Sequence, residues 1–258
     1  MDVVNNISRS LNTKIIGKTI YQFKKVDSTN RISADMAKKG VEEGTVLIAE
    51  IQEKGRGRIG RSWFSPEGNI YLSIILRPAL SSQMASLLTL IASISVTRVI
   101  RDITSLDAKI KWPNDIFIRN KKVGGILTEL SADSEKIRYA VVGIGLNVNI
   151  EKNDLPEEIS SVATSLREEA GRSIDRRSLV VNLLEDFELW YAVMKNRERD
   201  RILNEWKRLS DTIGRWVEVR LHDKKIEGLA YDITEDGYLK IRLKDNSLET
   251  VVAGDICY

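Results

Sequence analysis

The stretch EKGRGRIGRSWFSPEGN, the glycine–arginine loop at residues 53–69, lies between two apolar segments typical of strands, GTVLIAEIQ and NIYLSIILRP. Its letters match the dinucleotide fingerprint G-x-G-x-x-G and come within one residue of the phosphate loop G-x-x-x-x-G-K-[ST]. Both of those loops lead directly into a helix, whose N-terminal amides bind the phosphate. Here Pro66, Gly68 and a strand follow instead, so we reject both fingerprints.

The basic side chains of this loop still need an explanation. Arg56, Arg58 and Arg61 carry forked donors that suit phosphate or carboxylate oxygens, and the glycines let the backbone close over a ligand. A solvated basic hairpin and a nucleic-acid-binding patch are the alternatives. The loop alone does not decide among these three interpretations.

Composition limits the chemistry that the chain can carry. Its 258 residues suit one large domain, or one domain with a small appendage, and its net charge of +3 is too small for a global polyanion binder. A single cysteine, Cys257, indicates a reducing compartment, and a single histidine, His222, excludes a multi-histidine metal site. We expect His222 on the surface and a chemistry of carboxylates, lysines, arginines and amides, with or without magnesium.

No segment has the pattern of a signal peptide or a membrane span. The longest uncharged run, residues 79–97, has nearly the length of a span. Its small hydroxyl residues recur at helical spacing, however, which suits close packing in a soluble core. We therefore expect a cytoplasmic protein that contacts no membrane.

Apolar spacing and turn signals predict an α+β chain. Strands are expected at TIYQFKKV, GTVLIAEIQ, NIYLSIILRP, AKIKWPNDIFI, KKVGGILTEL and IRYAVVGIGLNVN, and helices over DSTNRISADMAKKG, after residue 79 and over 175–209. From about Thr212, short alternating segments broken by turn residues predict a small β-barrel. The expected parts are an N-terminal extension at 1–20, too short for a helix-turn-helix module, a main domain at 21–210 and a β-domain at 211–258.

Two further motifs contain residues that suit a ligand site. In KWPND, Asn114 and Asp115 end a strand, where they also fit an ordinary turn, and Lys122 returns seven residues later beside VGGIL. VVGIGLNVN interrupts an apolar strand with Gly143 and Gly145, which indicates that another group packs against the bare backbone. Each motif alone is a weak indication of function.

Taken in order, DSTN, the glycine–arginine loop with its flanking strands, KIKWPNDIFIRNKKVGGILTEL and VVGIGLNVN resemble the biotin–protein ligases over residues 21–150. The last stretch, with AGDI, looks like that family's SH3-like C-terminal domain. The resemblance implies an α+β fold in which a mixed β-sheet with packed helices is joined to a small SH3-like β-barrel. It also implies two steps. Biotin and ATP form biotinyl-5′-AMP and pyrophosphate, and a lysine of a biotin carboxyl carrier domain then takes the biotinyl group.

The same resemblance implies roles for particular residues. The biotin site would contain Ser28, Thr29, Asn30, Gln52, Gly55, Arg56, Gly57, Arg58, Lys122, Gly125, Leu127 and Gly143. The nucleotide site would contain Arg56, Arg58, Arg61, Trp63, Lys111, Asn114, Asp115, Lys122, Gly145 and Asn147. The residues with implied catalytic roles are Lys122, Arg58, Asp115 and Lys111, and Asp115 would help to hold Mg²⁺. For Trp63, core packing is an equal alternative to contact with adenine.

Partners follow from the resemblance as well. Repressor members of the family carry an N-terminal DNA-binding domain that this chain lacks, so we expect no sequence-specific DNA binding, and a homodimer by resemblance. A lipoate-type ligase of the same fold is the alternative. Gln52 and the pair of Ser28 and Thr29 argue against it, because a dithiolane ring offers nothing to hydrogen-bond. From another class, the alternative is a basic nucleic-acid-binding module.

Overall fold

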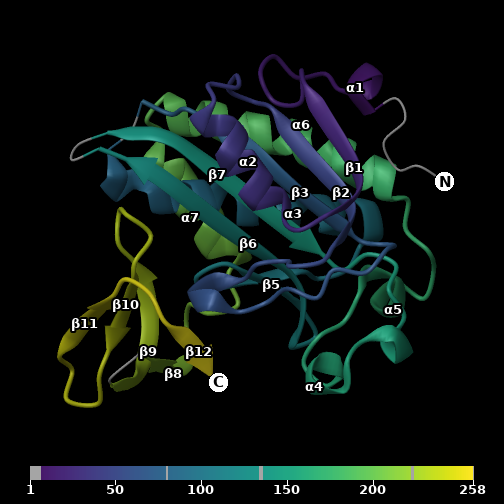
Figure 1. The fold of residues 1–258 in the computed structure, drawn as a ribbon. Helices are drawn as coiled ribbons and strands as arrows, with labels where there is room; N and C mark the ends of the chain where they lie inside the picture. The colour runs from purple at the N-terminus through teal and green to yellow at the C-terminus, as the bar shows by residue number, and fades with distance from the viewer. Residues whose placement is uncertain (1–6, 80, 134–135, 222–223, 258) are drawn as a thin grey trace.

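The computed structural model describes residues 7–79, 81–133, 136–221 and 224–257, so the expected surface position of His222 lies outside the described residues. Two β-sheets organise the chain (Figure 1). One is a seven-stranded mixed sheet with helices on both faces, and the other is a five-stranded antiparallel sheet near the C-terminus. The predicted fold class, α+β with a small C-terminal β-domain, is confirmed.

The large sheet has the strand order β1-β2-β3-β7-β6-β5-β4. Its strands are β1 (Ile20–Val26), β2 (Val46–Gln52), β3 (Ile70–Leu76), β4 (Lys109–Lys111), β5 (Asp115–Ile118), β6 (Lys121–Ala132) and β7 (Ile137–Leu146). The pair of β1 and β2 is parallel, and the other pairs of this sheet are antiparallel. Every segment expected to be a strand in this region forms one, and AKIKWPNDIFI supplies two.

Helices cover both faces of this sheet. The helices of the described chain are α1 (Ile7–Ser10), α2 (Thr29–Lys38), α3 (Ser86–Thr104), α4 (Glu157–Ser160), α5 (Leu166–Ala170), α6 (Arg176–Lys195) and α7 (Arg199–Leu209). Of these, α2 packs on one face of the sheet and α3 on the other, with α6 and α7 packed against α3. Adjacent strand residues point to opposite faces. Leu47 and Ile75 therefore pack against α2, whereas Val46 and Ile74 belong to the larger core beneath α3, α6 and α7 (Figure 1).

The helix bounds partly follow the sequence. The segment expected to be helical from Asp27 or Ser28 to Gly40 forms α2, which begins after Ser28, and Gly40, with a φ of +87°, takes the left-handed conformation just beyond its end. Residues 175–209, expected to be helical, form two helices, α6 and α7. Arg197 lies between them with a φ of 62°, a left-handed conformation that interrupts the helical hydrogen bonds.

The five-stranded sheet has the order β11-β10-β9-β8-β12. Its strands are β8 (Trp216–Arg220), β9 (Lys225–Ile233), β10 (Leu239–Arg242), β11 (Leu248–Val251) and β12 (Asp255–Cys257). Trp112 fastens this sheet to the large one. Its indole Nε1 donates to the carbonyl oxygen of Gly237 at 3.0 Å, and its backbone N–H donates to Thr212 Oγ1 at 3.0 Å. The KWPND turn is thereby held against the C-terminal β-domain.

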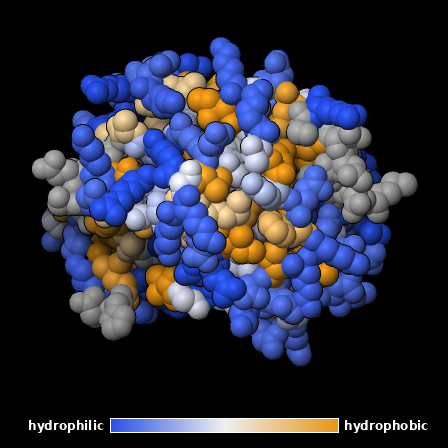
Figure 2. Space-filling view, turned by 45° about the horizontal axis from the view of Figure 1, so that its top comes forward, coloured by the Kyte–Doolittle hydropathy of each residue, from blue (hydrophilic) through white to orange (hydrophobic). Residues whose placement is uncertain are grey.

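Residues 86–97 of the long uncharged run belong to α3, and hydroxyl residues of this part lie inside the core. Ser93, Ser95 and Thr97 are fully buried, and the two serines donate to carbonyl oxygens three and four residues back in the helix. In the described part of the chain, no helix combines the length and apolarity needed to cross a membrane. Hydrophilic side chains cover most of the face in Figure 2, with hydrophobic patches between them.

Replacing Trp112 by Phe should weaken the attachment of the β-domain. The change keeps an aromatic ring but leaves the Gly237 carbonyl oxygen without its buried donor, which costs about 1–3 kcal/mol. Urea unfolding measures the loss, and Trp216→Phe, at a side chain that is 49% exposed, is the control with little expected effect. Equal stability of the two variants would show that the Trp112 hydrogen bond contributes nothing.

Candidate active site

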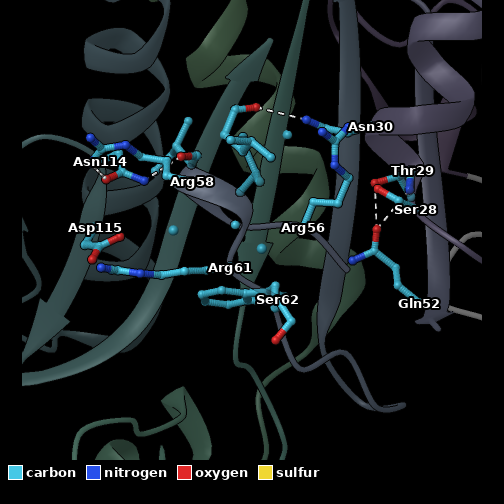
Figure 3. Close-up of a pocket in the computed structure, with 18 of the residues that line it drawn as sticks. Ser28, Thr29, Asn30, Gln52, Arg56, Arg58, Arg61, Ser62, Asn114 and Asp115 are labelled. Atoms are coloured by element: carbon cyan, nitrogen blue, oxygen red, sulfur yellow. Dashed lines mark hydrogen bonds between the residues drawn. The ribbon is translucent and has the colours of Figure 1, made fainter. Parts of the chain in front are cut away.

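A cleft on the α2 face of the large sheet encloses about 720 Å³, part of it open to solvent. Its walls come from the start of α2, the end of β2, the glycine–arginine loop, β5, β6, β7 and the C-terminal β-domain. Most predicted site residues meet here (Figure 3). They are Ser28, Thr29, Asn30, Gln52, Arg56, Gly57, Arg58, Arg61, Trp63, Asn114, Asp115, Lys122, Gly125, Leu127, Gly143 and Gly145.

Three predicted residues lie outside this cleft. Gly55 and Asn147 line a neighbouring hollow instead. Lys111 pairs with Asp115 across β4 and β5, and its ammonium lies 4.8 Å from the centre of the Phe117 ring. Burial lowers the pKa of Lys111, while the charge of Asp115 raises it in part. Lys111 thus contributes positive charge beside Asp115 and does not line the cleft wall.

Bare glycine backbone forms the floor of the cleft. A Cβ added to Gly143 would lie 2.0 Å from Asn30 Oδ1, and one added to Gly145 would lie 2.8 Å from the Trp63 indole. Gly125, on β6, pairs directly with Gly145 on β7. The expectation that another group packs against the interrupted apolar strand is confirmed, because Asn30 and Trp63 both do so.

Four oxygen atoms form a row at one end of the cleft. Gln52 Oε1, Thr29 Oγ1, Ser73 Oγ and Asn30 Oδ1 follow one another at 3.1, 2.8 and 2.7 Å. The two end atoms are amide oxygens, which only accept, so the two hydroxyl groups supply two protons for three contacts. This end of the cleft therefore has a surplus of acceptors and suits a ligand that brings N–H groups.

The glycine–arginine loop folds back on itself as a short hairpin. Gly57 N–H donates to the carbonyl oxygen of Arg61 at 2.7 Å, and Trp63 N–H donates to that of Gly55 at 2.8 Å. A Cβ on Gly55 would lie 2.3 Å from the Trp63 carbonyl oxygen, so this approach requires glycine. Between β2 and β3, the only helical element in the described chain is the three-residue turn η1 (Arg58–Gly60) inside the loop, which agrees with the rejection of both phosphate-loop fingerprints.

The three arginines of the loop reach different parts of the molecule. One contacts β6, another the turn between β4 and β5, and the third the C-terminal strand β12. The pairs are Arg56 Nη1 with Glu129 Oε1 at 2.8 Å, Arg58 Nη1 with Asn114 Oδ1 at 2.9 Å, and Arg61 Nη1 with Asp255 Oδ1 at 3.1 Å. Burial lowers the pKa of Arg58, and the nearby carboxylates of Asp115 and Asp255 oppose that shift.

Lys122 lies at the centre of the charged end. Its Nζ is 2.7 Å from Asp115 Oδ1 and 5.3 Å from the centre of the Trp63 ring. The lysine backbone is also fixed, because its N–H donates to the Val162 carbonyl oxygen at 2.8 Å and its own carbonyl oxygen accepts from Thr164 N–H at 2.9 Å. A rigid ammonium beside a carboxylate can bind an anion without a large rearrangement.

Trp63 separates the cleft from a second, more apolar hollow. Phe64, Leu155, Ile159 and Val162 contribute apolar side chains to that hollow, and Gly55 and Asn147 also line it. Trp63 Nε1 is buried and has no hydrogen-bond partner among the described residues. The structure therefore places Trp63 at the site and not in the general core.

Comparisons with known proteins agree with this geometry. Residues 22–147 match the model of the biotin/lipoate A/B protein ligase family, and residues 212–257 match that of the biotin protein ligase C-terminal domain. The bifunctional ligase/repressor BirA of Bacillus subtilis is 34% identical over 253 residues, which cover 98% of this chain and 78% of that protein. The chain belongs to the biotin/lipoate A/B protein ligase family.

Other members of the family are similar over nearly the whole chain. A biotin–[acetyl-CoA-carboxylase] ligase of Mycobacterium tuberculosis is 31% identical over 97% of this chain and 94% of its own length. The solved structure of the biotin protein ligase from Aquifex aeolicus in complex with biotin and ATP superposes with a TM-score of 0.80. It is 32% identical and the match covers 93% of this chain and 98% of that one.

Sequence reasoning missed several residues of this ligase site. Ser73 belongs to the oxygen row, Glu129 holds Arg56, and Asp255 reaches the cleft from the C-terminal β-domain. Ser73 and Glu129 stand in strand segments without a motif of their own. Asp255 lies in AGDI, which the sequence analysis assigned only to the C-terminal domain. The position of Asp255 within that family motif was the one sequence feature that could have indicated a role in the cleft.

The two floor glycines of the ligase should respond differently to alanine. Gly143→Ala forces a methyl group against Asn30, whose amide is hydrogen-bonded on every side, so we expect a loss of about 1–3 kcal/mol. Gly145→Ala meets the Trp63 side chain at the end of a loop, which can move, so less than about 1 kcal/mol is expected. Urea unfolding compares the two. Equal losses of unfolding free energy in the two variants would show that Asn30 is held no more tightly than Trp63.

Proposed function

We propose that this protein is a biotin–protein ligase. It activates biotin with ATP to biotinyl-5′-AMP, releases pyrophosphate, and transfers the biotinyl group to a specific lysine of a biotin carboxyl carrier domain. The observation that carries the proposal is the polarity of the cleft, which has an acceptor-rich row of oxygens at one end and three cations at the other. Those cations are Arg58, Arg61 and Lys122.

The oxygen row supports biotin over lipoate. A ureido ring brings two N–H donors and one carbonyl acceptor, and a row that lacks one proton gains most from such donors. A dithiolane ring brings no N–H group, so the one contact of the row that lacks a proton would stay unsatisfied, at a cost of about 1–3 kcal/mol. The biotin ring is therefore assigned to the end formed by Thr29, Asn30, Gln52 and Ser73.

The cationic end supports the first step. The carboxylate oxygen of biotin attacks the α-phosphorus of ATP, the bond to the β-phosphate oxygen breaks, and pyrophosphate leaves. Both reactants are anions, so their repulsion is the barrier that Lys122 and Arg58 lower by placing positive charge between them. The protein supplies no nucleophile, which agrees with its single histidine and single cysteine.

The apolar hollow beyond Trp63 is assigned to adenine. A flat aromatic base can stack on the Trp63 indole and contact Leu155, Ile159 and Val162, while Asn147 offers a polar group at the edge of the hollow. The two hollows share Gln52, Ser62, Trp63 and Lys122, so an acyl-adenylate can extend from one into the other.

A magnesium ion fits the cleft as a companion of ATP. Mg²⁺ at nucleotide sites takes one or two carboxylates plus phosphate oxygens and water, and Asp115 and Asp255 both line the cleft. Among the described residues no cluster of three or more His, Cys, Asp or Glu residues would hold a metal without a nucleotide. The ion would neutralise phosphate charge, and the chain's own cations would orient the acid.

The second step needs an uncharged amine close to the acyl carbon. The acceptor lysine nitrogen attacks that carbon, the mixed anhydride bond breaks, AMP leaves with the bonding electrons, and the amine loses a proton. Asp115, ion-paired to Lys122 at the open side of the cleft, is the carboxylate placed to orient this amine. The acceptor is a biotin carboxyl carrier protein or domain.

We propose domain boundaries at 21–210 and 211–258, after an extension at 1–20. The two family matches and the second sheet, which starts with β8, support them. The homodimer, the absence of sequence-specific DNA binding and the cytoplasmic location stay predictions. Light scattering, a salt-titrated DNA-binding assay and cell fractionation test them in turn.

ATP–pyrophosphate exchange tests the proposed function directly. Purified protein with Mg²⁺ should exchange pyrophosphate into ATP when biotin is present, because formation of the adenylate is reversible. Parallel reactions with lipoate and with no acid should stay at background. Exchange with lipoate alone would keep the mechanism and overturn the assignment of the ring end.

Lys122→Met should lower biotin-dependent exchange by about 10²–10³-fold, because the methionine side chain keeps much of the volume and removes the charge from the reacting anions. Lys121→Met is the matched control. Lys121 is the preceding residue of β6 and lines neither hollow. Equal activity of the two variants would show that the catalytic charge lies elsewhere.

A further inference from the structure

The carboxylate of Glu129 contacts groups on two sides of the cleft. Its Oε2 accepts a hydrogen bond from Asn30 Nδ2 at 2.9 Å, and its Oε1 lies 2.8 Å from Arg56 Nη1. Asn30 belongs to the start of α2, and Arg56 belongs to the glycine–arginine loop. Figure 3 shows Arg56 extending from the loop toward the side of the cleft where Asn30 lies. Glu129 therefore joins two segments that are distant in the sequence.

The Asn30 side of this contact is rigid. Asn30 is 4% exposed, its second amide proton goes to the Leu127 carbonyl oxygen at 3.1 Å, and its Oδ1 accepts from Ser73 Oγ at 2.7 Å. Because both amide protons and the amide oxygen have partners, the orientation of Asn30 is fixed. Glu129 is held in place by this amide, and its other oxygen is directed at the loop.

The Arg56 pair differs from the other two contacts of the loop. Arg58 and Arg61 reach the end of the cleft assigned to phosphate, where a triphosphate competes with their present partners. Arg56 instead shares the Glu129 carboxylate with Asn30, at the end assigned to the biotin ring. Its pair with Glu129 can thus persist when the nucleotide binds, and it anchors the loop through the reaction cycle.

We propose that Glu129 is a positioning residue that anchors the glycine–arginine loop, through Arg56, to the side chain that orders the ring end of the cleft. This inference rests on the proposed function for its effect on biotin. Its consequence is that seating of the biotin ring and closure of the loop are coupled. Arg56 then acts as an anchor and does not bind phosphate. Since the pair is partly exposed, it adds little to global stability.

Glu129→Gln separates the two contacts, because the amide oxygen can still accept from Asn30 while the ion pair with Arg56 is lost. In the unliganded protein, trypsin cleavage after Arg58 should become about tenfold faster than in the wild type. In pyrophosphate exchange, the KM for biotin should rise about tenfold with the KM for ATP unchanged. Asp133→Asn, which removes the Arg138 ion pair just beyond the C-terminal end of β6, is the control expected to match the wild type.

Arg56→Gln should reproduce both effects, and the double variant with Glu129→Gln should be no worse than either single variant. The proposal would be overturned if Glu129→Gln behaved like the Asp133→Asn control. It would also be overturned if the effects of Glu129→Gln and Arg56→Gln added in the double variant. A rise in the KM for ATP as large as that for biotin in Glu129→Gln would overturn it as well. Wild-type protein without biotin-dependent exchange would refute the proposed function alone. The trypsin comparison would still decide whether Glu129 holds the loop.

Discussion

The cleft depends on the register between β6 and β7. In that register Gly125 faces Gly145, and Leu127 faces Gly143, so three glycines expose bare backbone on the α2 face of the sheet. A shift of one residue would turn those glycines toward the larger core and replace them with side chains on the α2 face. Asn30 could then not approach β7, and the oxygen row would lose its end.

The two ends of the cleft differ in chemistry, and each is built on a residue that packs against this glycine floor. Asn30, fixed against Gly143, orders the hydroxyl groups that continue toward Gln52, and this end accepts more hydrogen bonds than it can donate. Trp63, seated on Gly145, lies within reach of the Lys122 ammonium at the other end. The separation of acceptors from cations selects a ligand with a polar ring at one end and an anion at the other.

The small C-terminal β-domain takes part in this site. Trp112 fixes the KWPND turn to that domain, and the same turn carries Asn114 and Asp115 into the cleft. Asp255, on the last strand, contacts Arg61 of the loop. The loop is therefore restrained by contacts with both sheets.

The sequence by itself determined the elements and the contiguous motifs. Alternation and turn residues located the strands, and the glycines of VVGIGLN indicated a close approach, because a glycine inside an apolar strand leaves bare backbone that another group can contact. The sequence did not separate Lys111, which lies beside Asp115 on the neighbouring strand, from the residues of the cleft wall, and it contained no sign of Ser73 or Glu129. Only the tertiary structure decided these positions. Local patterns reflect the backbone preferences of neighbouring residues, whereas strand register and packing determine which distant side chains meet.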